Sequence, residues 1–199
     1  MRLIAEGLGL ERGGRRLFQD LGFALAGGEA LAVTGPNGAG KSSLLRLIAG
    51  LLQPTEGRIV VDGPEDRTVA ALAHFIGHLD GVKAALTAAE NLEFMRALLG
   101  GRPDGRSALA ALGIERLADL PAGLFSAGQK RRLALARLLI APRPLWLLDE
   151  PLTSLDADGQ TVFASLARAH LQRGGLIVAA THAALGIDGA RELKLGGGA

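Results

Sequence analysis

Short runs of alternating apolar and polar residues occupy the beginning of the chain. The runs Leu3–Leu10 and Arg16–Leu25 are separated by Arg12–Arg15, whose two central glycines are typical of a turn. This pattern predicts an antiparallel β hairpin or meander. The glycines and acid of Gly27–Glu29 then lead into the apolar run Ala30–Val33, which we expect to form the first core strand.

Apolar residues at helical spacing follow this strand. They recur through Ser43–Leu52, where Gly50 and Pro54 supply stop signals. Thr87 and Glu90 have the spacing of a capping box, so a helix should begin at about Thr87 and end before Gly100. A polar loop is expected next, over Gly101–Ser107. Further helices are expected over Ala108–Leu117, with a break at Gly113, from Ser126 to the prolines Pro142 and Pro144, and over Thr161–Gln172.

The remaining apolar runs read as strands that alternate with these helices. They are Arg58–Val61, Thr68–Gly77, Leu145–Leu148 and Leu176–Ala180, and the last two are continuously apolar, as in a parallel sheet buried on both faces. The predicted fold class is α/β: a mostly parallel core sheet, an N-terminal antiparallel β part and a helical insert. The insert covers about residues 85–125, or 85–140 with the helix that follows, in a single domain spanning residues 1–199. We expect a frayed tail from Leu195.

Composition and charge narrow the function classes. The chain has 199 residues, of which 48% are hydrophobic and 21% charged, with a net charge of +2 and no cysteine. One α/β core is therefore expected, while a disulfide framework and a cysteine-ligated metal site are excluded. The charge balance is weak evidence for nucleic-acid binding, and we expect none. Because no apolar stretch is long enough to span a bilayer, we expect a cytosolic chain that reaches membranes through a partner.

The most informative segment is Gly35–Ser42, which reads G-x-x-x-x-G-K-S between a predicted strand and a predicted helix. In this phosphate-binding pattern, glycines let backbone N–H groups turn inward around phosphate oxygens, and the helix N-terminus adds its dipole. Lys41 would reach the β- and γ-phosphates and Ser42 would bind Mg²⁺. The alternative is a glycine-rich turn with a solvated lysine. The predicted phosphate contacts are Gly35, Pro36, Asn37, Gly38, Ala39, Gly40, Lys41, Ser42 and Ser43.

Two adjacent acids, Asp149 and Glu150, end the apolar run Leu145–Leu148. Ligands bind at the carboxyl ends of strands in α/β sheets, so both acids are candidates for chemistry. Asp149 would hold Mg²⁺ together with Ser42, and Glu150 would polarise the attacking water. Neighbouring residues of a strand point to opposite faces, so only the turn at Pro151 lets both serve one site. Two solvated acids in a turn are the alternative.

Five motifs occur in the order and spacing of the ATP-binding subunits of ABC transporters, a branch of the P-loop NTPases, and the chain resembles them over essentially its whole length. The resemblance implies a head-to-tail homodimer in which the signature segment of one copy caps the ATP held by the phosphate loop of the other. It also implies that His182 contacts the γ-phosphate and the attacking water, whereas a histidine after a strand is by itself more often a packing or surface residue. The motifs are Gly35–Ser42, the signature segment Ser126, Ala127, Gly128 and Gln129, the strand Leu145–Glu150, the loop Ser154–Asp156 with Ser154 and Asp156 linking the two ATP sites, and His182.

The chain departs from the family pattern at four positions. Phe125 replaces a leucine, and Ala127 replaces a glycine, which is mild if the backbone there does not need a positive φ. His78 stands where the family usually has the glutamine that senses Mg²⁺ and the membrane partner. Arg12 stands where an aromatic side chain often stacks on adenine, and it is a predicted ATP contact because a guanidinium can also stack on a base. Beside the signature segment, Lys130–Arg132 is expected either to help bind phosphate across the dimer or to form a solvated helix face.

Local sequence resembles one branch of the family, the ATPases of cytochrome c biogenesis. That branch implies a peripheral subunit at the cytoplasmic face of the inner membrane, docked on the membrane proteins CcmB and CcmC and powering release or export of haem with its chaperone. We expect the docking surface around His78–Leu99. Another ABC transporter, a soluble iron–sulfur assembly or translation-associated ATPase, and a nucleotide-gated module without turnover are the alternatives. The segments that carry the resemblance are Gly77–Lys83, Leu86–Leu92, Phe125–Gln129 and Pro144–Pro151.

Overall fold

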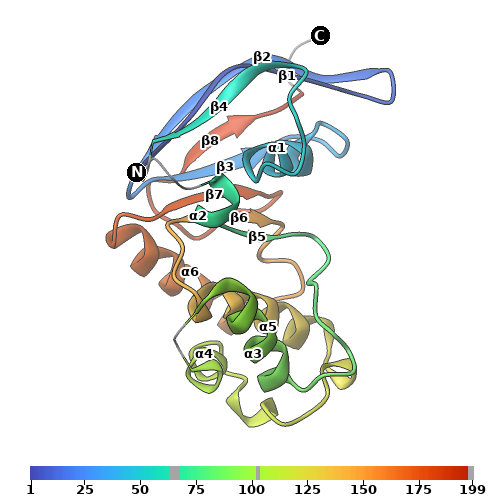
Figure 1. Ribbon diagram of the computed structural model, residues 1–199, viewed down its shortest axis with the longest axis vertical. Helices are drawn as coiled ribbons and strands as arrows, with labels where there is room; N and C mark the ends of the chain where they lie inside the picture. The colour runs from blue at the N-terminus through green and yellow to red at the C-terminus, as the bar shows by residue number, and fades with distance from the viewer. Residues whose placement is uncertain (63–67, 102–103, 197–199) are drawn as a thin grey trace.

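The computed structural model describes residues 1–62, 68–101 and 104–196. Figure 1 shows three tiers, with an antiparallel sheet at the top, a parallel sheet in the middle and a group of helices at the bottom. Helix α1 (Lys41–Ile48) lies between the two sheets.

The antiparallel sheet has the strand order β2-β1-β4. Strands β1 (Arg2–Arg12) and β2 (Arg15–Ala26) form the predicted hairpin, and β4 (Glu56–Asp62) pairs with the other edge of β1. Leu3 and its cross-strand partner Leu25 are both fully buried, so one face of this sheet packs inward.

The core sheet has the order β5-β6-β7-β3-β8 within the described residues, and its pairings are all parallel. This confirms the predicted core sheet. Parallel strands end at the same edge of a sheet, so the loops after β3, β6 and β7 meet there. The strands are β5 (Ala73–Ile76), β6 (Leu145–Asp149), β7 (Leu176–Ala180), β3 (Ala30–Thr34) and β8 (Arg191–Lys194).

Strand β6 shows how this sheet separates two cores. Leu145 and Leu147 pack with α1 and the antiparallel sheet, whereas Trp146 and Leu148 pack with the helices below. Every residue of β6 is buried, as is every residue of β7. A strand buried on both faces has no polar face to show, which explains the continuous apolar runs.

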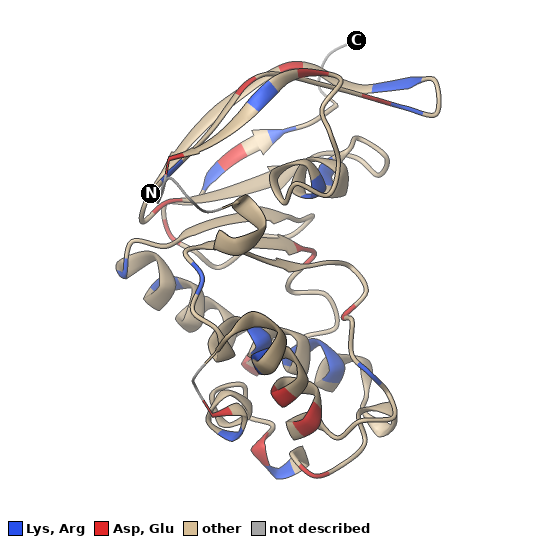
Figure 2. Ribbon diagram, viewed as in Figure 1, with Lys and Arg blue, Asp and Glu red and all other residues tan. Residues whose placement is uncertain are grey.

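The helical tier contains the predicted insert. Thr87 and Glu90 form the predicted capping box: Glu90 N–H donates to Thr87 Oγ1 at 3.1 Å, and Thr87 N–H donates to Glu90 Oε2 at 2.8 Å. Charged residues of both signs occur throughout this tier, as Figure 2 shows. Its elements are α3 (Ala88–Leu99), α4 (Gly105–Ala111), the 3-10 turns Glu115–Leu117 and Ala122–Leu124, and α5 (Ala127–Ile140); α6 (Ala157–Gln172) packs between this tier and the sheet.

Several predicted helix boundaries are wrong. α1 ends at Ile48 instead of Leu52, because Gly50 takes a φ of +73°. α4 begins at Gly105, inside the expected polar loop, and α6 begins four residues before Thr161. Each early start has an aspartate cap, Asp104 for α4 and Asp156 for α6.

Two strand predictions also need correction. The expected strand Thr68–Gly77 is the short helix α2 (Val69–Leu72) followed by β5. The tail is not frayed at Leu195, which is 2% exposed and donates its N–H to the Thr34 carbonyl at 2.8 Å, continuing the pairing of the unexpected strand β8. Part of the expected polar loop and the last residues of the tail lie outside the described residues. Among the described helices, none has the length and apolarity needed to cross a bilayer.

Candidate active site

The phosphate loop connects β3 to α1, and its glycines allow its shape. Gly40 precedes α1 with a φ of +99°, and Gly35 has a φ of +133°. A Cβ at Gly35 would lie 2.3 Å from the Leu195 carbonyl oxygen, so any side chain there would collide with backbone. The sequence therefore places glycine where the loop needs both a left-handed backbone and close packing.

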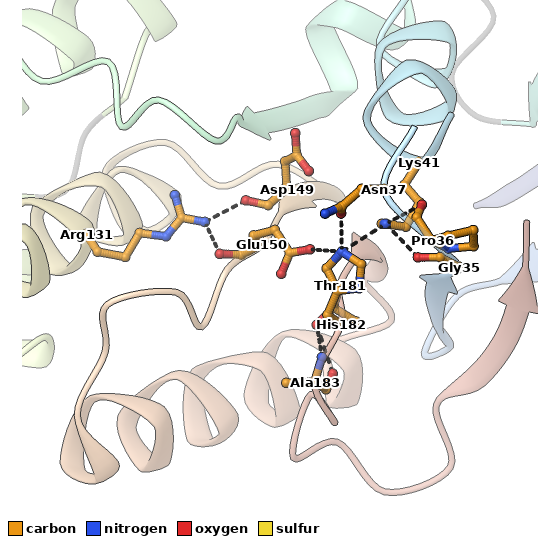
Figure 3. Close-up of polar contacts among 10 residues, drawn as sticks. All are labelled: Gly35, Pro36, Asn37, Lys41, Arg131, Asp149, Glu150, Thr181, His182 and Ala183. Carbon is orange, nitrogen blue, oxygen red and sulfur yellow. Dashed lines mark hydrogen bonds and ion pairs between the residues drawn. The ribbon is translucent and has the colours of Figure 1, made fainter. Parts of the chain in front are cut away.

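Lys41 is the first residue of α1 and points back along the loop. Its side chain is buried, with the residue 8% exposed, and its Nζ donates to the carbonyls of Gly35 at 2.8 Å and Pro36 at 3.2 Å. The same ammonium lies 3.0 Å from His182 Nε2, as Figure 3 shows. A buried cation is thus held at the mouth of the loop, next to the N-terminus of a helix, where an anion is favoured.

His182 follows β7 and is brought to the loop by a small turn. Thr181 is 1% exposed, and its hydroxyl accepts the N–H of Ala183 at 3.0 Å. His182 Nε2 lies 3.0 Å from Asn37 Oδ1 and 3.6 Å from Glu150 Oε1. When Nε2 accepts a hydrogen bond from the Lys41 ammonium, the ring proton of the neutral imidazole resides on Nδ1. His182 therefore joins the phosphate loop to the acidic end of β6.

The two acids at the end of β6 have different surroundings. Glu150 takes a φ of +50° and donates its N–H to the Ala180 carbonyl at 2.8 Å, which turns its side chain toward His182. Asp149 is 4% exposed, and no dashed line reaches its carboxylate in Figure 3. No hydrogen bond or ion pair joins this carboxylate to another described residue. Asp149 lines a cavity and has no protein cation beside its carboxylate among the described residues, so this position favours a bound cation.

These groups line one cavity of about 840 Å³, a size suited to a nucleotide. Arg12 and His78, which the sequence assigned to this site, also line it, and the turn after β6 does let both acids face one space. Thr153 and Gln160 also line the cavity but were not predicted as site residues. Gln160 was missed because α6 begins at Ala157, earlier than the apolar pattern of the sequence indicated. The lining residues that the sequence analysis named are Arg12, Asn37, Gly38, Gly40, Lys41, Ser42, Ser43, His78, Asp149, Glu150 and His182.

The signature segment lies elsewhere, along a second concavity of about 450 Å³. Ser126, Gly128 and Gln129 line it together with Ser154 and Asp156. Asp156 accepts the N–H of Gly159 and a bond from Arg132, and these contacts hold the pKa of its carboxyl below the usual range. Within one copy the signature segment therefore does not line the phosphate cavity.

The start of α5 explains the tolerated alanine. Ser126 Oγ accepts Gln129 N–H at 3.2 Å, and Gln129 Oε1 accepts Ser126 N–H at 2.9 Å. Ala127 is the first residue of the helix and is not among the described non-glycine residues with positive φ, so it needs no glycine there. Gly128 is different, because an added Cβ would lie 2.7 Å from the Ser154 carbonyl oxygen.

Both expectations for Lys130–Arg132 are wrong at Arg131. This residue is 3% exposed and points away from the second concavity, toward the turn after β6. Its neighbour Arg132 pairs with Asp156 instead. A run of three basic residues on a helix is usually solvated. The hydrogen-bond partners of Arg131 lie far away in the sequence, so the sequence does not indicate that this arginine is buried.

Comparison with known proteins gives a consistent result. The family of ABC transporters matches residues 18–153. The chain is 55% identical, over the full length of both proteins, to the cytochrome c biogenesis ATP-binding export protein CcmA of Rhodopseudomonas palustris strain HaA2. It is 50% identical to the protein of the same name from Rhizobium meliloti strain 1021, with 99% of each chain covered.

Solved structures agree on the fold. A putative ABC transporter ATP-binding protein from Pyrococcus furiosus has a TM-score of 0.84 at 22% identity, with 98% of each chain covered. An ATP-binding cassette in a dimeric post-hydrolysis state, bound to ADP and Pi, has a TM-score of 0.81 at 25% identity, covering 97% of this chain and 94% of the other.

Proposed function

The chain belongs to the ABC transporter family and, within it, to the cytochrome c biogenesis ATP-binding export proteins CcmA, and from this premise we propose that its ATP hydrolysis powers a membrane complex that exports or releases haem with its chaperone. The proposal takes residues 1–199 as one ATP-binding domain, with a helical part of about residues 85–140. The observation that carries it is the convergence of Lys41, Glu150 and His182 at one cavity.

The phosphate loop holds the triphosphate of ATP in this proposal. Backbone N–H groups at the start of α1 face the phosphates, and the Lys41 ammonium exchanges its contacts with Gly35 and Pro36 for the β- and γ-phosphate oxygens. Arg12 lies on the cavity wall that the hairpin supplies, where its planar guanidinium stacks on adenine.

Ser42 and Asp149 are the residues that would hold Mg²⁺. Both line the cavity, and a hydroxyl with a carboxylate is an oxygen donor set that suits this ion. The buried carboxylate of Asp149 has no cationic partner among the described residues, which fits a metal neighbour. When bound, Mg²⁺ neutralises charge on the β- and γ-phosphate oxygens.

Glu150 acts as the general base in the hydrolysis that we propose. Its carboxylate takes a proton from water while the water oxygen forms a bond to the γ-phosphorus; the bond from that phosphorus to the bridging oxygen breaks, and ADP leaves. His182, 3.6 Å from Glu150 Oε1 and 3.0 Å from Lys41, lies between the base and the phosphate loop, where it orients the γ-phosphate and the water.

A second copy of the chain completes each site. The concavity lined by Ser126, Gly128 and Gln129 faces the ATP of the partner copy, so that the Ser126 hydroxyl and the start of α5 meet the γ-phosphate. The loop with Ser154 and Asp156 lies beside this segment and links the two sites. The support for this pairing is that these residues share a concavity which is not the phosphate cavity.

The region of His78–Leu99 is our candidate for docking on transmembrane subunits resembling CcmB and CcmC, at the cytoplasmic face of the inner membrane. It exposes large apolar side chains, with Leu79 86% exposed, Leu98 67% and Phe94 46%. Exposed apolar groups of this size favour a protein partner. His78 lies in the same segment and lines the nucleotide cavity, so it occupies a place between ATP and the membrane partner.

Co-purification tests the proposal. Glu150→Gln should keep ATP and hold the dimer closed, so membranes solubilised in mild detergent with ATP and Mg²⁺ should yield this variant together with CcmB- and CcmC-like proteins and a haem chaperone. Lys41→Ala, which should not bind ATP, is the matched control. Recovery of an unrelated permease or of soluble partners alone would contradict the haem assignment, and normal phosphate release by Glu150→Gln would contradict the role of Glu150.

A further inference from the structure

Arg131 is the most fully bonded buried side chain near the site. It extends from α5 and is 3% exposed, and a guanidinium has five N–H donors. These donors reach five acceptors, which are the carbonyls of Pro151 (3.2 Å), Gly77 (3.1 Å), Asp149 (2.7 Å) and Glu150 (2.6 Å) and the Asp80 carboxylate (2.9 Å).

Three of these acceptors are consecutive carbonyls in the turn that carries the proposed base. Glu150 has a φ of +50°, a conformation that is unfavourable for a residue with a side chain. Its carbonyl accepts Arg131 Nη2, as Figure 3 shows, while its N–H donates to Ala180 on β7. Both backbone polar groups of Glu150 are therefore hydrogen-bonded, the N–H to Ala180 and the carbonyl to Arg131.

The other two acceptors lie in the segment between β5 and α3. Gly77 and Asp80 flank His78, which lines the cavity, and the exposed Leu79. Asp80 pairs with Arg131 with only 4% of the arginine side chain exposed, so the pair is little screened by solvent. One guanidinium thus joins this segment directly to the backbone of Glu150.

We propose that Arg131 is a positioning residue for ATP hydrolysis, holding Glu150 in its left-handed conformation and making that conformation depend on the Gly77–Asp80 segment. The inference rests on the proposed role of Glu150. Arg131 contacts neither the nucleotide cavity nor the signature concavity, so it acts through the backbone of the base.

The test measures steady-state ATP hydrolysis and ATP binding by the purified full chain. Misplacing a catalytic group by an ångström lowers rates by up to about 10²-fold, so Arg131→Met should lower kcat about tenfold or more while KM and the affinity for ATP stay unchanged. Arg131→Lys keeps the charge but not the planar fork, and should recover part of kcat.

Arg143 supplies the control. It follows α5 and, like Arg131, donates to carbonyls that are distant in sequence, those of Ala70 at 2.6 Å and Ala73 at 3.3 Å, which belong neither to the turn after β6 nor to the Gly77–Asp80 segment. Arg143→Met should lower the thermal midpoint and leave kcat unchanged. An equal loss of kcat in both variants, or an unchanged kcat in Arg131→Met, would overturn the positioning role.

Glu150→Gln, assayed in parallel, separates this inference from the proposed function. If Glu150→Gln abolishes turnover and Arg131→Met does not lower it, only the role of Arg131 fails. If Glu150→Gln still turns over normally, the base assignment itself fails. Should Arg131→Met not fold, Arg131→Lys carries the test, and a wild-type kcat in that variant overturns the inference.

Discussion

Helices α1 and α5 both begin beside a hollow in the surface, but their first turns are built differently. α1 is preceded by Gly40, which has no side chain to cap it, and its first residue is the buried Lys41. α5 is preceded by Ser126, which forms a capping box with Gln129. The first turn of a helix has N–H groups without helical partners. In α1 these N–H groups are available to a ligand, whereas in α5 the Ser126 side chain accepts one of them.

The difference follows from where each helix gets its stability. α1 lies between two sheets and buries Leu44, Leu45 and Ile48 completely, so packing holds it without a cap. The start of α5 is at the surface, where a cap contributes about 1 kcal/mol. Because packing stabilises α1, its N-terminus can remain uncapped and bind phosphate. The start of α5 is exposed, so Ser126 serves both as a cap and, in our proposal, as a contact to ATP.

Removing the cation of α1 should give the largest effect. Lys41→Ala deletes charged hydrogen bonds to phosphate in a buried position, and we expect the affinity for ATP to fall by about a hundredfold or more. Equilibrium titration with a fluorescent ATP analogue measures this. Arg46→Ala, an exposed charge at the other end of α1, is the control and should bind ATP normally. An unchanged affinity in Lys41→Ala would contradict the open-terminus interpretation of α1.

The C-terminal ends of α1 and α5 differ as well, because a buried histidine lies next to the end of α5. Lowering the pH should therefore destabilise the fold near α5. The carbonyl of Ala141, just after α5, lies 2.6 Å from Nε2 of His74, which is 4% exposed. Burial lowers the pKa of His74 from 6.5 to about 4, outweighing the bond to Ala141, and burial likewise lowers the pKa of His170 to about 4. α1 ends instead at Ile48, with a titratable group in its last turn only at Arg46.

The two buried histidines make the folded state less stable in acid, because the unfolded state binds protons more readily. Between about pH 6.5 and 4 the unfolded chain carries protons that His74 and His170 in the fold do not, so stability is complete above pH 6.5 and falls as the pH falls. For His74 the loss is on the order of 3 kcal/mol. Thermal unfolding from pH 8 to 4 measures it, and His74→Gln should flatten the curve. A midpoint that stays constant down to pH 4 would contradict the neutral, buried state of His74.

The sequence predicted those parts of the molecule that local chemistry determines. The cap at Thr87 was recognisable because its partner Glu90 lies three residues further along the chain. The two buried strands were recognisable because burial on both faces excludes polar residues. β8 was missed because its residues are mostly exposed and only its pairing with β3 makes it a strand. α2 was missed because it is a single turn.

The residues of the site also differ in how far the sequence alone could predict them. The phosphate loop and the acids after β6 are contiguous motifs, and the structure brings them to one cavity. Arg131 has contacts 18 to 54 residues away, and nothing in its own neighbourhood distinguishes it from Arg132. A residue whose role depends on distant backbone carbonyls leaves no periodicity and no motif, so only the folded arrangement shows it.

The smallest effect should come from the cap of α5, and it tests the dual use of Ser126. Ser126→Ala should cost about 1 kcal/mol of stability, a typical loss for a missing cap. If the serine also meets the partner's ATP, turnover should fall at least about tenfold, while ATP binding to a single copy stays normal. Asp104→Ala removes the side-chain cap of α4 instead; it should lower the thermal midpoint and leave turnover unchanged. Equal turnover in the two variants would mean that Ser126 is only a cap, and that the start of α5 differs from that of α1 in stability alone.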